Sequence, residues 1–135
     1  MTEANRRRNA RSEAGLGDDA LQAAAALLQL GLHNDAASRA YYAAFHYARA
    51  LLLTEGLEPR THRGLGSLLG ERFGVTGRLR PEALAILARL QTYRMAADYE
   101  AAERLSIERA SLEVADAHAF VDEALAVLKA GGWLD

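Results

Sequence analysis

The stretch Ser38–Arg49 reads SRAYYAAFHYAR and sets aromatic and basic side chains into an alanine-rich run. At 3.6 residues per turn, four of its polar side chains share one side of a single helix, and these are Arg39, Tyr42, His46 and Arg49. A helix this apolar is not surrounded by water. We therefore expect it at the centre of the fold, where the polar stripe is a packed interior seam, a dimer surface or a binding site.

The segment before this stretch predicts a partner helix over residues 18–31. Asp18 begins that helix as an N-cap, an apolar run follows, and Gly31 ends it. Only a few residues separate it from the helix expected over 35–55, so the two helices form an antiparallel hairpin. Ahead of them, Gly15-Leu16-Gly17 is expected to break any earlier helix.

Three further helices are expected after this hairpin, over residues 61–73, 81–100 and 107–130. The first of them carries Gly64 and Gly66, which suggest a close approach to another element because glycine is costly inside a helix. No window of the sequence shows the alternation of a strand. The pattern predicts an all-α fold, an up-and-down helical bundle of four main helices plus a short additional helix.

The chain divides into three parts: a basic N-terminal arm, flexible or partly helical, over residues 1–17, the bundle over 18–130 and a C-terminal tail over 131–135. Apolar spacing also predicts the inner faces of the last two helices. These faces are Leu84, Leu87, Ala88, Gln91, Met95 and Asp98 in the first helix, and Leu112, Ala115, Ala119, Phe120, Ala124, Val127 and Leu128 in the second.

The composition is that of one ordinary globular domain, with 135 residues of which half are apolar and a quarter charged. The absence of cysteine excludes disulfides and thiolate chemistry. The net charge of −2 gives no general case for nucleic-acid binding, although four arginines against Glu3 in the first 11 residues form either a solubilising tail or a phosphate grip. We expect a cytoplasmic protein, because no segment has the length of a membrane span or the pattern of a secretory signal.

The four histidines of the sequence do not suggest a metal site. No two of them lie at i, i+3 or i, i+4, and neither HExxH nor Glu-x-x-His occurs. A serine nucleophile in a G-x-S-x-G turn is also absent from the sequence. We expect no metal and no cofactor.

A second polar segment, Tyr93–Tyr99, lies at the end of the helix expected over 81–100 and reads YRMAADY. Its Arg94 and Asp98 are four residues apart, close enough for an ion pair. A buried pair needs further polar partners, and the stripe of residues 38–49 can supply them across a helix interface. A network that only fixes the packing of the two helices is the alternative.

Three segments in this order resemble the prokaryotic HEPN domain, the "higher eukaryotes and prokaryotes nucleotide-binding" family. They are Ser38–Leu57, the THRGL of Thr61–Leu65, and Arg94 followed by the ADY of Ala97–Tyr99. The resemblance spans residues 18–128 and implies a helical bundle. Many such domains are encoded beside a minimal nucleotidyltransferase as the toxin of a toxin–antitoxin pair. Many are metal-independent ribonucleases, in which a homodimer brings two copies of an arginine-x4–6-histidine motif around one RNA cleft.

The resemblance assigns the motif's catalytic arginine to Arg94. The positions where its histidine is expected hold Tyr99, Glu100 and Ala101. A tyrosine, with a pKa of about 10, is a poor base at neutral pH, and the remaining candidates, His46 and His62, do not lie at matched positions. The tyrosine that a partner nucleotidyltransferase modifies in some family members is also replaced, because its position holds Ala101.

Three hypotheses about function follow. The first is a nucleotide- or RNA-binding module, acting with a nucleotidyltransferase partner in a toxin–antitoxin-like system; its site consists of Arg39, Tyr42, His46, Arg94, Asp98 and Tyr99. The second is a homodimeric ribonuclease toxin with Arg94 as a catalytic residue. The third is a non-catalytic structural dimer or adaptor. A homodimer is expected in each case, without contact to a membrane.

Overall fold

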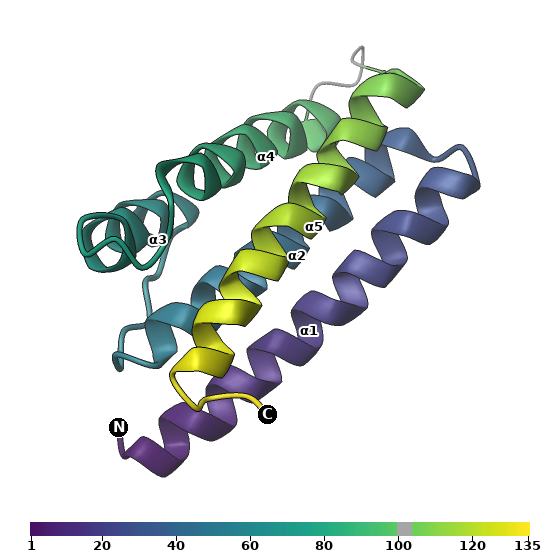
Figure 1. Ribbon diagram of the computed structural model, residues 1–135. Helices are drawn as coiled ribbons and strands as arrows, with labels where there is room; N and C mark the ends of the chain where they lie inside the picture. The colour runs from purple at the N-terminus through teal and green to yellow at the C-terminus, as the bar shows by residue number, and fades with distance from the viewer. Residues whose placement is uncertain (100–103) are drawn as a thin grey trace.

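A computed structural model describes residues 1–99 and 104–135 as a bundle of helices (Figure 1). The elements are α1 (Glu3–Gln29), α2 (His33–Leu53), α3 (His62–Leu69), a single π-helical turn η1 (Gly70–Gly74), α4 (Pro81–Tyr99) and α5 (Ile107–Ala130). The described residues contain no strand, and the predicted all-α bundle is confirmed. The sequence predictions made for Glu100 and Ala101 lie outside the described residues.

Helix α2 is the central element of the bundle. It packs against α1, α3, α4 and α5, while α1 and α5 run along its length (Figure 1). Twelve of its residues are buried, seven of them alanines. Because alanine lets two backbones come close together, the alanine-rich run of α2 can be enclosed on several sides at once. Helix α4 lies against α2 and α5, with α3 and η1 at its N-terminal end.

The expected break at Gly15-Leu16-Gly17 is wrong, because α1 is continuous from Glu3 to Gln29. Gly17 is buried against the ring of Tyr47, and a Cβ atom at this position would lie 2.5 Å from Tyr47 Cδ2. The glycine therefore permits a close approach of α1 to α2 without ending the helix. Buried Ala10 and Ala14, just before it, supply packing that offsets the cost of helical glycine.

The N-terminal turns of α1 contact the segments that follow α2 and α5. Arg6 donates a hydrogen bond of 3.2 Å to the carbonyl oxygen of Thr54, and Arg7 donates one to the carbonyl of Gly132. Both guanidinium groups also lie over the indole ring of Trp133, at 5.9 and 5.0 Å from its centroid. These contacts hold the first arginines of the chain on an ordered helix.

The predicted inner faces of α4 and α5 are partly wrong. Met95 and Leu112, both predicted to face inward, are 48% and 53% exposed, whereas Arg94 and Glu113 are 5% and 0% exposed. The apolar spacing missed these positions because it assigns charged residues to the surface. In each helix a charged residue, next to an exposed apolar one, occupies the buried face.

Candidate functional site

Arg94 lies on the buried face of α4 and forms the centre of the candidate site. Its Nη2 donates to Gln91 Oε1 at 3.2 Å, and its Nη1 donates to the Tyr99 hydroxyl at 3.4 Å. Nη1 also lies 3.6 Å from Asp98 Oδ2. Its Nε, which is buried, has no hydrogen-bond partner among the described residues. The guanidinium is thus held by long contacts that leave part of its donor capacity unused.

Three tyrosine rings surround the guanidinium of Arg94. Its Cζ lies 5.3 Å from the ring centroid of Tyr41, 5.7 Å from that of Tyr42 and 5.6 Å from that of Tyr99. A cation over an aromatic face is stabilised most where water is excluded, and Tyr41 is only 1% exposed. The rings therefore offset part of the cost of burying this charge.

His62, a histidine of α3, lies beside the Arg94 cage, which consists of Arg94 and the rings of Tyr41, Tyr42 and Tyr99. His62 Nδ1 is 2.6 Å from the Tyr41 hydroxyl, and its ring centroid is 4.8 Å from that of Phe45. Burial raises the pKa of Tyr41 well above its ordinary value, although the charge of Arg94 opposes this effect. Burial, and then the positive charge of Arg94, lower the pKa of His62. A neutral phenol and a neutral imidazole therefore share this hydrogen bond near pH 7.

Most of the residues predicted for the site do lie together. The guanidinium of Arg39 is 4.8 Å from the ring centroid of Tyr42, and Tyr42 in turn lies against Arg94. Asp98 contacts Arg94 and also accepts a hydrogen bond of 3.3 Å from the hydroxyl of Ser38. Helices α2 and α4 therefore meet through the two polar segments that the sequence singled out.

His46 makes its polar contact with Glu13 of α1 and not with α4. Its Nδ1 lies 2.7 Å from Glu13 Oε2 on α1, and Arg49 Nε lies 3.3 Å from the other oxygen of Glu13. The stripe on α2 is therefore divided, because its first half faces Arg94 and its second half faces α1. Ring contacts join His46 to the site, with centroid distances of 6.4 Å to Tyr42 and 5.3 Å to Phe45.

The sequence predictions did not place Tyr41, Gln91 and His62 in the site. Gln91 precedes Arg94 by three residues, a spacing that brings two side chains onto one face of a helix. Tyr41 is next to the predicted stripe. His62 was singled out only as part of the THRGL segment that resembles the family. Its position beside Tyr41 could not be predicted, because the contact of α3 with α2 is a tertiary contact.

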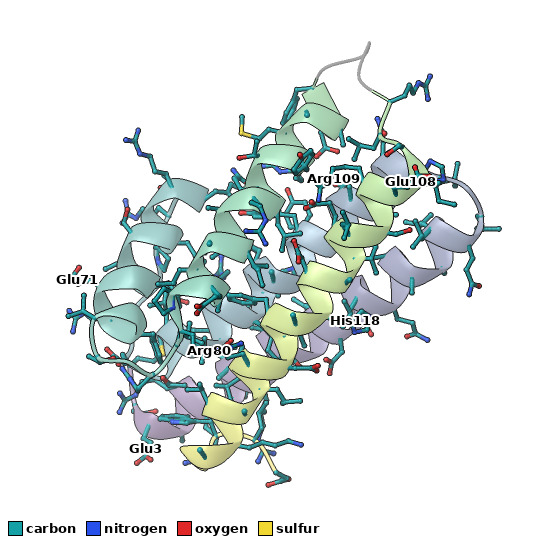
Figure 2. All side chains as sticks on the ribbon, turned by 45° about the horizontal axis from the view of Figure 1, so that its top comes forward. Glu3, Glu71, Arg80, Glu108, Arg109 and His118 are labelled. Carbon is teal, nitrogen blue, oxygen red and sulfur yellow. The ribbon has the colours of Figure 1, made fainter. Side chains whose placement is uncertain are left out.

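Charge pairs on α5 complete the interface with α4. Arg109, labelled in Figure 2 at the start of α5, lies 4.6 Å from the ring centroid of Tyr93 and donates to its hydroxyl at 3.0 Å. Its Nε is 3.4 Å from Glu113 Oε1. Glu113 is fully buried and lacks a hydrogen-bond partner among the described residues. Burial raises its pKa to about 7.

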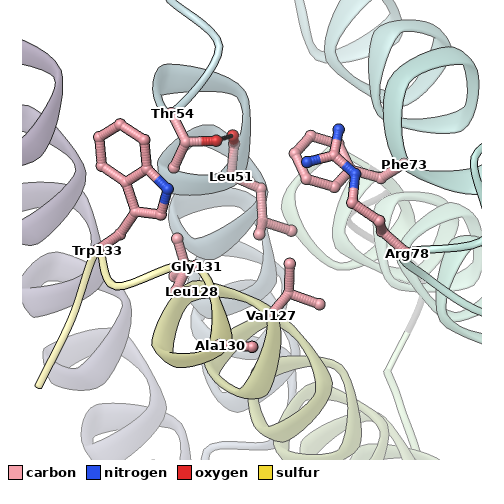
Figure 3. Close-up of a pocket in the computed structure, with 9 residues that line it drawn as sticks. All are labelled: Leu51, Thr54, Phe73, Arg78, Val127, Leu128, Ala130, Gly131 and Trp133. Carbon is pink, nitrogen blue, oxygen red and sulfur yellow. Dashed lines mark hydrogen bonds between the residues drawn. The ribbon is translucent and has the colours of Figure 1, made fainter. Parts of the chain in front are cut away.

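A separate cavity of about 390 Å³ lies toward the other end of α2, between Trp133 and Phe73 (Figure 3). Its floor is apolar, and Arg78, stacked 3.9 Å from the ring centroid of Phe73, already forms an ion pair with Glu55. Residues 1–99 and 104–135 contain no cluster of side chains suited to a metal ion. Within the same ranges, no helix has the length and hydrophobicity that crossing a membrane requires.

The fold and the site define a class of protein: a small all-α bundle in which a buried arginine, surrounded by tyrosines, lies where two central helices meet. The chain belongs to the HEPN family, because the model of the HEPN domain matches residues 17–130. A protein of Methanocaldococcus jannaschii named "Putative toxin" is 35% identical over 114 residues, which cover 84% of each chain. A "UPF0332 protein" of Gloeobacter violaceus is 34% identical over 82% of this chain and 89% of its own length.

Proposed function

We propose that this HEPN protein binds a nucleotide or an RNA phosphate at Arg94, and that it acts in the cytoplasm with a nucleotidyltransferase partner in a toxin–antitoxin-like pair. One observation carries the proposal. A buried arginine at the position of the family's functional arginine keeps an unpartnered Nε and holds its neighbours through long contacts. The relatives named "Putative toxin" support the biological role.

The present contacts of Arg94 are long enough for a phosphate to replace them. Hydrogen bonds between two charged groups are short, whereas Asp98 and Tyr99 lie 3.6 and 3.4 Å from Nη1. Tyr99 is 72% exposed and is the last described residue of α4, so its side chain can turn outward without loss of core packing. A phosphate that replaces these contacts gains a guanidinium already desolvated by aromatic rings.

Titration with short single-stranded RNA and with nucleotides tests this proposal. We expect saturable binding that weakens with salt, and a loss of at least about tenfold in Arg94→Gln, since a hydrogen bond to a charged group contributes about 1.5–3 kcal/mol. Arg89→Gln is the matched control on the same helix, because Arg89 forms an exposed ion pair with Asp116. Circular dichroism confirms that both variants fold. Equal affinities in the two folded variants would refute a role for Arg94.

His62 supports a second candidate function, a ribonuclease. Its imidazole is neutral near pH 7 and contacts Tyr41, whose ring lies against Arg94. The imidazole can take the proton of a 2′-hydroxyl while Arg94 binds the phosphate. This candidate predicts cleavage of RNA without added metal, lost in both His62→Gln and Arg94→Gln. RNA left intact by the wild-type protein would exclude this second candidate.

The nucleotidyltransferase partner has its own test. Co-expression with a nucleotidyltransferase encoded by a neighbouring gene, followed by size-exclusion chromatography, is expected to give a co-eluting complex. Separate elution at micromolar concentration would count against the paired system while leaving nucleotide binding untouched.

A further inference from the structure

A groove with a volume of about 370 Å³ lies between α3 and η1 on one side and α4 on the other. Its apolar lining includes Leu65 of α3 and Leu84 and Leu87 of α4. The volume is within the range of small-molecule sites, which combine an apolar lining with a few polar groups. The groove adjoins the Arg94 cage but is distinct from it, because Arg94 does not line it.

Small residues keep this groove open. Gly66 and Gly70 lie one helical turn apart in its wall, and a Cβ atom added at either position would meet no atom within 4 Å. The sequence had suggested that Gly64 and Gly66 mark a close approach to another element, and this is wrong. Among the described residues, a Cβ at Gly64 would meet only the Thr61 hydroxyl of its own helix cap within 3.5 Å, and Gly66 faces open space.

Polar groups gather where the groove adjoins the Arg94 cage. The Tyr41 hydroxyl and His62 form their hydrogen bond there, and Gln91, which binds Arg94, lines the same groove. These three side chains are uncharged near pH 7 and offer hydrogen bonds to a ligand edge. Among the described residues that line the groove, Arg63 alone carries a formal charge, and it is exposed.

We propose that this groove binds the base of a nucleotide, with its phosphate at Arg63. A flat heterocycle fits between the glycine-lined wall and the leucines, and its polar edge pairs with Gln91 and His62. An alkyl chain would make no hydrogen bond to Gln91 or His62, and a cationic ligand would be repelled by Arg63. The inference rests on the proposed function and adds to it a second site, in which the phosphate of the nucleotide contacts Arg63 and not Arg94.

Filling the groove tests the inference without weakening the fold. Gly66→Leu places a side chain in the open space and replaces a helical glycine, so the variant is expected to be at least as stable as the wild type. Gly15→Leu is the matched control, since Gly15 is also a helical glycine with open space around it but lies on α1. Isothermal titration with the four ribonucleosides and their 5′-monophosphates measures binding, and thermal melting checks folding.

We expect Gly66→Leu to weaken nucleoside and nucleotide binding at least tenfold and Gly15→Leu to leave it unchanged. Arg63→Gln is expected to weaken binding of the monophosphates several-fold and to spare the nucleosides. Unchanged nucleotide affinity in Gly66→Leu would overturn the groove site but not the proposed function, provided that Arg94→Gln still loses RNA binding. Decanoate binding lost in Gly66→Leu, without any nucleoside binding, would show an alkyl site and also overturn the inference. If the wild type binds neither nucleotides nor RNA, both proposals fail.

Discussion

At the scale of single residues, two charged side chains are buried among the described residues, and their environments differ. Arg94 lies among three tyrosine rings and keeps polar contacts on its own helix. Glu113 has Arg109 at 3.4 Å, in a geometry that forms no hydrogen bond, and its oxygens lack partners among the described residues. Arginine keeps its charge at any physiological pH, whereas a carboxylate can take up a proton when it is buried.

The stability of the protein is therefore expected to depend on Glu113. Its folded pKa of about 7 is above the ordinary value, so the folded state binds more protons than the unfolded state between about pH 4.5 and pH 7. Stability falls as pH rises through that window. Glu113→Gln cannot titrate there, and we expect it to gain up to about 3 kcal/mol over the wild type between pH 4.5 and pH 8. Urea unfolding at both pH values measures the difference.

The control for this prediction is Glu71→Gln, which changes an exposed glutamate on η1 (Figure 2). If the free energies of unfolding of Glu113→Gln and the wild type differ by the same amount at the two pH values, Glu113 does not titrate in this range.

At the scale of elements, the two glycines of α1 have opposite effects. Gly17 lies against the Tyr47 ring, which is fixed by a hydrogen bond of 2.6 Å from its hydroxyl to Asp18, so Gly17→Ala is expected to destabilise the protein by about 1–3 kcal/mol. Gly15 has open space around it, and Gly15→Ala is expected to stabilise the protein by about 0.5–1 kcal/mol. Denaturant melts of the two variants compare them directly. The same sign for both would contradict this account of α1.

Helix bounds could be predicted from the sequence better than contacts between helices. Caps, glycines and a proline located α2, α3, α4, α5 and the C-terminal end of α1 closely, because these signals act within one turn of the chain. The predicted start at Asp18 is wrong, because α1 begins at Glu3 with Thr2 as its N-cap. Continuity of α1 through Gly17 could not be predicted, because it depends on the Tyr47 ring from another helix. Likewise Arg94 and Asp98 could be paired by spacing, but the enclosure of Arg94 by Tyr41 depends on how α4 packs on α2.

At the scale of the whole molecule, exposed apolar side chains near the end of α4 support the expected homodimer. Met95 and Tyr99 lie one turn apart and are 48% and 72% exposed. We expect light scattering to give a dimer at micromolar concentration, and Met95→Glu to shift it to a monomer by placing a charge in the interface. Val75→Glu is the control, since Val75 is 84% exposed on the segment after η1. A wild-type monomer, or dissociation by both variants, would contradict this dimer.

The sequence by itself determined the helices from residue 18 onward, the central position of α2 and the two polar segments that meet at the site. These properties follow from periodicity and capping, which involve neighbours along the chain. Only the tertiary structure decided that the stripe of Ser38–Arg49 is divided between α4 and α1, and that His62 adjoins Tyr41 beneath Arg94. Packing between helices determines which buried charges find partners, because such contacts join residues far apart in the sequence.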